Sequence, residues 1–295
     1  MTTEQYELES LLQQQANQFF MRDGGKNECA IKTYIIADFE FAYDRSRHGG
    51  YLVSEGTSAE TKVRWPFHLI AAASWQVMRC TPGLERPEFE PPVVMSNDEH
   101  TEAEIVESFF LALDSMPSAK LVTWGGEVRD LAVLRRMAEE HGLLLPPQIA
   151  DLSPLSACRI DLCDATAVRA ERVHLAEYAA ACSIPAKPSP SKSIGKLVER
   201  ADWAAVEDQV LADVMTTTVI LINHLKARSV ITCNRAATFM ALAEKASAAV
   251  RGSDFLRLRF LPWVRSRKAS AGLRGKVYRA EDVTTSAQKE DLPCS

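Results

Sequence analysis

Residues 33–41 of the chain read TYIIADFEF, a stretch in which β-branched and aromatic residues follow one another almost without a break. Such a run is typical of a central strand that is buried on both faces of a sheet. Two carboxylates interrupt it, Asp38 and Glu40. Because side chains alternate between the two faces of a strand, residues two apart project from the same face. The sequence therefore predicts two acidic side chains lying next to each other on an otherwise hydrophobic strand.

This acidic pair needs an explanation, because neighbouring negative charges repel each other and are poorly solvated in an apolar setting. A bound cation is the simplest compensation, and hard carboxylate oxygens suit Mg²⁺ or Mn²⁺. The alternative is that the strand ends at Asp38 and that water solvates both acids. The pair alone leaves both interpretations open.

Two later acids fall in predicted helices. Asp130 lies near the start of a helix expected at residues 127–141, where the helix dipole by itself favours an acid, so a surface role stays open. Asp213 falls in the middle of a helix expected from Trp203 to Leu225, among apolar neighbours. Aspartate has poor helix propensity, and a role as metal ligand would explain its presence there.

The remaining pattern predicts an α/β layered fold, with strands first and then alternating helices and strands. Gly125 and Gly126 are expected to form a tight turn, and Thr101 and Glu104 have the spacing of a capping box. Further strands are expected at residues 67–78, 91–95 and 119–124, further helices at 5–21, 101–116 and 174–182, and loops at 43–64 and 185–190.

Three short motifs follow one another along the chain: DFE at residues 38–40, WGGEVRD at 124–130 and LADVMTT at 211–217. In this order they resemble the exonuclease motifs of the DEDD superfamily. Within that superfamily, the chain looks like the predicted 3′-5′ exonucleases related to the proofreading domain of family-B DNA polymerases. The resemblance covers residues 31–226, and further landmarks lie at residues 160–162, 175–179 and 183–187.

The resemblance implies an RNase H-like three-layer fold with a mixed five-stranded sheet flanked by helices. It also implies two divalent metal ions, Mg²⁺ or Mn²⁺, held by Asp38, Glu40, Asp130 and Asp213. One ion would activate a water and the other would stabilise the leaving 3′ oxygen. The implied reaction is hydrolysis of nucleic acid, single-stranded DNA first, from its 3′ end to nucleoside 5′-monophosphates. Substrate contacts are expected from a further set of residues, namely Phe39, Phe41, Trp124, Gly126 and Lys187.

Three positions depart from the family's pattern. Gly125 stands where relatives usually have Asn, Gln209 stands where a Tyr is expected, and Asp208 stands where a sister subclass carries His. Glutamine can orient a water by hydrogen bonding but is no base, so Gln209 is predicted to act in catalysis only in that way. The alternative function is a catalytically weak or silent nucleic-acid-binding module. A protein-interaction scaffold is a third possibility, which the acids in apolar settings argue against.

The composition is that of a globular protein with one core and extensions, or at most two small domains, since 46% of the 295 residues are hydrophobic. No apolar run of about 18 residues occurs, so no membrane span is expected. The seven scattered cysteines and the polar N-terminus predict a cytoplasmic protein. We expect a helical extension at residues 1–29, the exonuclease-like domain at 30–226, a helical and basic extension at 227–280 and a disordered tail at 281–295.

The basic extension contrasts with the chain's net charge of −5. Residues 251–279 hold nine lysines and arginines and one acid, interleaved with Phe255, Phe260, Trp263 and Tyr278. Cations among aromatic rings suit contact with phosphates and stacking on bases, which would make nucleic acid the partner of this segment. The alternative is that the rings pack on the body of the protein and that the charges are simply solvated.

Overall fold

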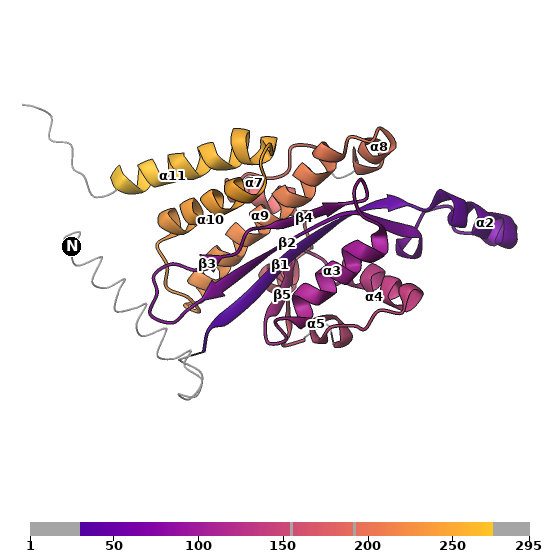
Figure 1. Cartoon of the computed structure of the whole chain (residues 1–295), viewed down its shortest axis with the longest axis horizontal. Coiled ribbons are helices and arrows are strands. Elements are labelled where there is room, and N and C mark those ends of the chain that lie inside the picture. The colour runs from indigo at the N-terminus through magenta and orange to yellow at the C-terminus, as the bar shows by residue number, and fades with distance from the viewer. Residues whose placement is uncertain (1–29, 154–155, 191–192, 274–295) are drawn as a thin grey trace, which may run out of the picture.

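The computed structural model of the protein describes residues 30–153, 156–190 and 193–273 (Figure 1). A mixed sheet lies at its centre, with the strand order β3-β2-β1-β5-β6 and with β4 also paired to β2. β1 runs antiparallel to β2 and parallel to β5, and β5 runs parallel to β6. The strands are β1 (Lys32–Tyr43), β2 (His68–Cys80), β3 (Glu88–Phe89), β4 (Val93–Ser96), β5 (Lys120–Thr123) and β6 (Arg159–Asp161).

The strand predicted at residues 33–41 is β1, in the middle of the sheet, and it extends two residues further to Tyr43. The sheet has six strands rather than the five that the resemblance implied. The difference arises after β2, where Pro91 and Pro92 separate β3 from β4. Proline has no backbone N–H to give to a ladder, so this segment forms two short strands on β2 instead of one longer strand.

Helices cover both faces of the sheet, which confirms the predicted α/β three-layer class (Figure 1). One face packs on α3 (Glu102–Asp114), α4 (Asp130–His141) and α5 (Pro147–Ala150), around a core that includes Ile35 and Phe39. The other face packs on α9 (Trp203–Ala227), around a core that includes Ile36. The remaining helices are α6 (Leu162–Ala167), α7 (Leu175–Ala181), α8 (Ile194–Glu199), α10 (Arg235–Ala249) and α11 (Leu261–Leu273), with short turns of helix at Gly56–Ser58, Trp65–Phe67 and Leu256–Phe260.

Residues 43–64 were predicted to be a loop, and the structure corrects this, because α2 spans Arg45–Glu55. Two adjacent glycines in the middle of that helix lower its intrinsic propensity. An N-terminal cap and the packing of side chains compensate for this low propensity. The Asp44 carboxylate accepts a hydrogen bond from the Arg47 N–H at 2.8 Å, and the His48 ring packs edge-to-face on Phe67 at 5.0 Å.

The predicted helix ends are confirmed where local chemistry defines them. Thr101 and Glu104 form the capping box at the start of α3, and Asp202 caps α9. Gly142 ends α4 in the left-handed conformation, with φ +66°. α4 begins at Asp130 rather than at residue 127, because residues 125–129 form a turn.

The helices after α9 pack on the same core as α9. Phe255, Phe260 and Val264 are buried in it, and Trp263 packs against it. This supports the alternative interpretation of the basic segment, in which these rings pack on the body of the protein, while Arg259, Arg265 and Lys268 are exposed.

The proposed division of the chain at residue 226 stays a prediction. The expected extension at 1–29 and tail at 281–295, together with Tyr278, lie outside the described residues. Within the part of the chain that the structure describes, no helix combines the length and the apolar character that a membrane span needs.

Candidate functional site

Three of the predicted acids meet between the sheet and α9. Asp38 and Glu40 project from the same face of β1, the face that α9 covers, and Asp213 lies on the buried length of α9. One carboxylate oxygen of each lies within 4.8 Å of one oxygen of both others. Glu40 is 7% exposed and Asp213 is 4% exposed. Asp38 is partly exposed, but the strand continues past it to Tyr43 and the pair lies against α9, which argues against the alternative of two solvated acids at a strand end.

Asp130 flanks this group without being part of it. It is the first residue of α4, beyond the end of β5, and it is 5% exposed. The charge of Asp130 contributes to the raised pKa of Asp38, and the charge of Asp213 contributes to the raised pKa of Asp130. The structure therefore brings three of the four predicted metal ligands together and places the fourth within electrostatic reach.

The turn before Asp130 depends on both glycines. Gly125 has φ +75°, which favours glycine, and a Cβ on Gly126 would lie 2.7 Å from the Thr123 hydroxyl. The Asp161 carboxylate accepts hydrogen bonds from the N–H groups of Gly125 at 2.8 Å and Glu127 at 3.3 Å. Gly126 was predicted to contact substrate. Its buried position against Thr123 gives it a structural role instead.

A buried ion pair holds the same turn from beneath. The Arg159 side chain is 3% exposed and donates to the Glu127 carboxylate at 2.6 Å. It also donates to the carbonyl oxygens of Gln148 at 2.7 Å and Asp151 at 2.6 Å. Because its donors are used on fixed acceptors, Arg159 positions the turn and with it the start of α4.

The pKa of each of the four acids is raised. Burial is the largest cause for all of them, and the charges of Asp213 and Glu40 add to the effect at Asp38, whose pKa lies well above its usual value. Burial raises the pKa of Glu40 to about 7 against the opposing effect of Lys187. Burial raises the pKa of Asp130 to about 6, although the positive charge of Arg129 opposes this rise. The site therefore holds more negative charge than its own cations compensate.

Lys187 lies inside this acidic group. Its ammonium nitrogen is 3.0 Å from Glu40 Oε1 and 2.5 Å from Asp213 Oδ2, and its side chain is 9% exposed. Burial lowers the pKa of Lys187, but the charges of Asp213 and Glu40 raise it further, to a net value above the ordinary one. The sequence predicted a substrate contact or a surface lysine. The structure makes Lys187 a buried counter-charge rather than a surface lysine, and its contact with a substrate stays a prediction.

One oxygen of Asp213 has no such partner. Its Oδ1 atom is buried and accepts no hydrogen bond from any residue that the structure describes. A buried carboxylate oxygen without a donor is costly, and a cation would satisfy it. Hard carboxylate oxygens are the ligands that Mg²⁺ and Mn²⁺ prefer. The residues present therefore fit a divalent metal ion.

Gln209 lies one helical turn before Asp213 and is fully buried. Its amide nitrogen donates to the Ser193 hydroxyl at 3.3 Å, and its amide oxygen has no partner among the described residues. Asp208 faces other groups, since its carboxylate accepts the Phe255 N–H at 2.8 Å and the Ser253 hydroxyl. Asp208 therefore anchors the C-terminal helices, while Gln209 retains a free acceptor.

The predicted aromatic contacts divide into two groups. Phe39 is 2% exposed and packs edge-to-face on Phe109 at 5.2 Å, on the opposite face of the sheet from Asp38. The structure thus places the Phe39 ring in the core between the sheet and α3, and its contact with a substrate stays a prediction that this packing does not support. Trp124 donates to the Val173 carbonyl at 3.1 Å and is partly buried. Its role stays a prediction.

Arg129 was missed by sequence reasoning. Its guanidinium carbon lies 4.7 Å above the Phe41 ring, and its Nε is 3.3 Å from Asp130 Oδ1. The side chain is 49% exposed. Its charge lowers the pKa of Asp130 and of Glu40, which places this cation at the rim of the acidic group. The only sequence signal was its position next to the motif aspartate.

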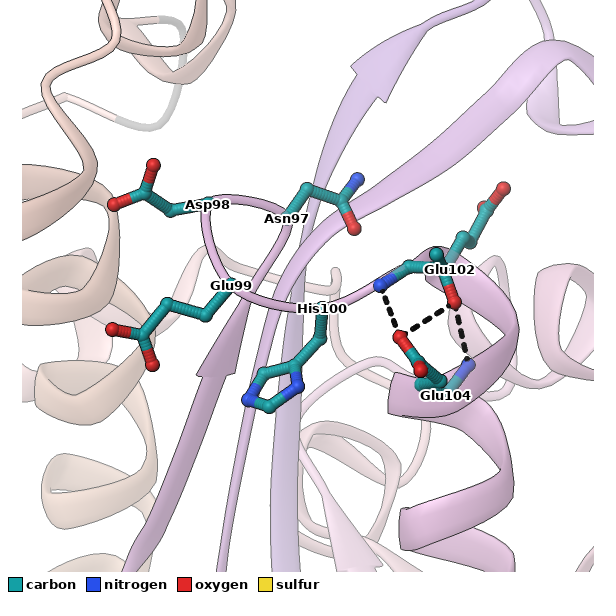
Figure 2. A pocket seen from close by; sticks show the side chains of 7 residues that line it. Asn97, Asp98, Glu99, His100, Glu102 and Glu104 are labelled. Carbon is teal, nitrogen blue, oxygen red and sulfur yellow. Dashed lines mark hydrogen bonds between the residues drawn. The ribbon is translucent and has the colours of Figure 1, made fainter.

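A surface hollow elsewhere has a different character. It lies in the turn between β4 and α3 and contains none of the clustered carboxylates (Figure 2). Glu104 is used in the capping box with Thr101, Glu102 accepts the Ile70 N–H at 2.6 Å, and the Asn97 amide donates to the Ile70 carbonyl at 2.7 Å. These polar groups hold the turn together.

Comparison with known proteins gives only distant likenesses. No family model matches the chain, and no curated protein matches it. Among solved structures, a family B DNA polymerase from the archaeon Pyrobaculum calidifontis has a TM-score of 0.44 and 14% identity, over 80% of this chain and 29% of that one. E. coli exonuclease I in complex with a dT13 oligonucleotide has a TM-score of 0.34 and 14% identity, over 67% of this chain and 41% of that one. A product-bound exonuclease I structure has a TM-score of 0.36 and 15% identity, over 67% of this chain and 44% of that one. The chain spans less than half the length of these proteins, so a function has to be argued from its own residues.

Proposed function

We propose that this protein is a metal-dependent 3′-5′ exonuclease that hydrolyses single-stranded DNA to nucleoside 5′-monophosphates. The observation that carries the proposal is the convergence of the partly exposed Asp38 with the buried Glu40 and Asp213, and an Asp213 oxygen that lacks a donor among the described residues. These acids belong, in the same order, to the three motifs that resemble those of the DEDD exonucleases.

Each residue of the site has a role in this proposal. Asp38, Glu40 and Asp213 would hold two divalent ions, Mg²⁺ or Mn²⁺, with Asp130 flanking them. Bound divalent ions supply a water of lowered pKa and compensation for the charge of the phosphate. The free amide oxygen of Gln209 orients a water by accepting its hydrogen, but takes no proton from it.

The rim of the site supplies a contact for the substrate backbone. Arg129 is half-exposed and rests on Phe41, which holds its guanidinium in place beside Asp130. A guanidinium presents several donors to phosphate oxygens. We propose that Arg129 binds a phosphate of the strand, and that Phe41 positions Arg129 rather than stacking on a base.

A 5′-labelled single strand incubated with the protein and Mn²⁺ tests the activity. We expect a ladder that shortens from the 3′ end, and its loss in Asp213→Asn. Asp114→Asn is the matched control, because Asp114 is exposed at the end of α3. If the natural protein and this control leave the strand intact while the strand binds, the exonuclease proposal is wrong.

Gln209 favours the second candidate, a weak or silent nucleic-acid-binding module, because its amide is no general base. General-base assistance is typically worth on the order of 10²–10⁴-fold. We therefore expect slow, metal-dependent digestion by the natural protein, and digestion at least about tenfold faster by Gln209→Tyr. Binding of a strand with no digestion by either protein would establish the silent module.

A further inference from the structure

The cation already present in the acidic group is Lys187. Its ammonium is within hydrogen-bond distance of two of the three clustered carboxylates, those of Glu40 and Asp213. An ammonium at such a position takes carboxylate oxygens that a divalent ion would otherwise coordinate. The site is thus partly filled by the protein's own charge.

The position of Lys187 is built by its surroundings. The residue follows Pro185, whose carbonyl accepts the Thr216 hydroxyl at 2.8 Å, and this contact ties the lysine loop to α9. The same hydroxyl also lies 2.7 Å from the Ala212 carbonyl within the helix. With a side chain only 9% exposed, Lys187 is held over Asp213 by packing and by the loop.

The two oxygens of Asp213 show how the site is divided. Oδ2 accepts from Lys187, while Oδ1 is buried with no hydrogen-bond partner among the residues described. One half of the carboxylate is therefore satisfied by the ammonium, and the other half is open to a cation.

The formal charges of the site also indicate one place for the Lys187 ammonium and one place for a divalent ion. The three clustered carboxylates of Asp38, Glu40 and Asp213 lie around the single ammonium of Lys187, while the flanking Asp130 pairs with Arg129 at the rim. The excess is two negative charges, which one divalent ion neutralises. A second divalent ion would give this buried site a net positive charge and would lie against the ammonium.

We propose that, in the protein free of nucleic acid, the Lys187 ammonium occupies the place of one of the two metal ions, so that the protein binds a single divalent ion. The second ion then requires Lys187 to leave its carboxylates. This inference rests on the proposed metal-dependent function, and it concerns how many ions the resting site holds.

Counting bound Mn²⁺ by equilibrium dialysis tests the inference without any measurement of activity. We expect one tight ion per chain in the natural protein, two in Lys187→Met and one in Lys196→Met. Lys196 is the matched control, since it is exposed on the neighbouring helix α8. Two tight ions in the natural protein, or one in a folded Lys187→Met, would overturn the inference.

Electron paramagnetic resonance of the natural protein gives a second readout that needs no variant. Two manganese ions at a two-metal spacing of about 3.5–4 Å are magnetically coupled, whereas a single ion gives the spectrum of an isolated centre. We expect the isolated spectrum, and a coupled pair would contradict the inference while leaving the proposed function intact. If no manganese binds, both the inference about Lys187 and the proposed metal-dependent function are wrong.

Discussion

At the scale of single residues, the site is defined by charge that is not fully compensated. The fold brings Asp38, Glu40 and Asp213 together, and Lys187 is the one cation that lies among them within the part of the chain that the structure describes. Burial raises the pKa of all three acids, and repulsion by neighbouring carboxylates raises it further at Asp38 and Glu40. Ionised acids in such a site destabilise the folded state when no metal ion is bound, and this cost accompanies the ability to bind one.

The effect of these charges on the free energy of unfolding can be measured at Glu40. Its pKa is raised by burial to about 7 from an ordinary value of 4.5, so the folded protein retains a proton that the unfolded chain releases between these pH values. The contribution of Glu40 to the free energy of unfolding therefore falls as the pH rises from about 4.5 to about 7. Without metal, Glu40→Gln should melt higher than the natural protein at pH 8, by about 3 °C or more, and the gap should shrink at pH 5.

Thermal melts of both proteins in the presence of a chelator measure this difference, in which titrating groups remote from Glu40 cancel. Mn²⁺ should reverse the order at pH 8, because metal binding requires deprotonated carboxylates. The exposed Glu107→Gln on α3 is the control and should follow the natural protein at both pH values. A gap that does not change with pH would show that Glu40 ionises at its ordinary pKa.

At the scale of elements, the turn between β5 and α4 determines where Asp130 lies. It is built by Gly125 in the left-handed region, by Gly126 against Thr123, and by the carboxylate of Asp161. The long helix α9 positions Asp213 from the other side. The sheet and one helix therefore supply the clustered acids, and the turn supplies the flanking one.

Substitutions of the two glycines of this turn should differ in their cost to stability. Gly126→Ala forces a Cβ to within 2.7 Å of the Thr123 hydroxyl, and overpacking typically costs about 1–3 kcal/mol. We expect a fall in melting temperature of several degrees and a weaker stabilisation by Mn²⁺, because α4 and Asp130 have to shift. Gly125→Asn should cost less than Gly126→Ala, since asparagine adopts a positive φ more readily than most side chains and a Cβ there meets no atom within 4 Å, although φ +75° still favours glycine.

Melting curves with and without Mn²⁺ compare the two variants directly. Equal behaviour of Gly126→Ala and the natural protein would mean that Thr123 moves aside at little cost. A loss of stability in Gly125→Asn as large as that in Gly126→Ala would show that even asparagine is strained at this φ.

At the scale of the whole molecule, the C-terminal helices carry a basic surface on a core that they share with α9. The buried rings of Phe255 and Phe260 show that this segment is part of the folded body, so its deletion would expose core rather than remove a tail. Trp263 donates to the Ser183 carbonyl at 2.7 Å, four residues before Lys187, and thereby joins α11 to the loop that enters the site.

A triple substitution of Arg259, Arg265 and Lys268 by glutamine tests this surface without disturbing the core, since all three are exposed. We expect weaker binding of single-stranded DNA and a shallower dependence of affinity on salt, because each lost phosphate contact reduces the slope by about 0.7 for a single strand. Fluorescence titrations at several salt concentrations measure the slope, and Arg129→Gln is a reference for a contact at the site. An unchanged slope would assign the basic surface to structure or to a protein partner.

The sequence by itself determined the features that depend on local chain geometry. The alternation of side chains in residues 33–41 predicted that Asp38 and Glu40 share a face, and the position of Asp213 in a helix predicted a buried acid. The α/β class followed from the order of elements. These inferences needed no knowledge of which distant residues meet.

The tertiary structure decided what depends on contacts between distant parts of the chain. Lys187 and Glu40 are 147 residues apart, and nothing in the local pattern shows that the lysine enters the acidic group. The same limit applies to Phe39, whose burial depends on α3, and to Arg129, which rests on Phe41 of the central strand. Local periodicity tells which way a side chain points along its own element, whereas its partners and its surrounding charge exist only once the elements have packed.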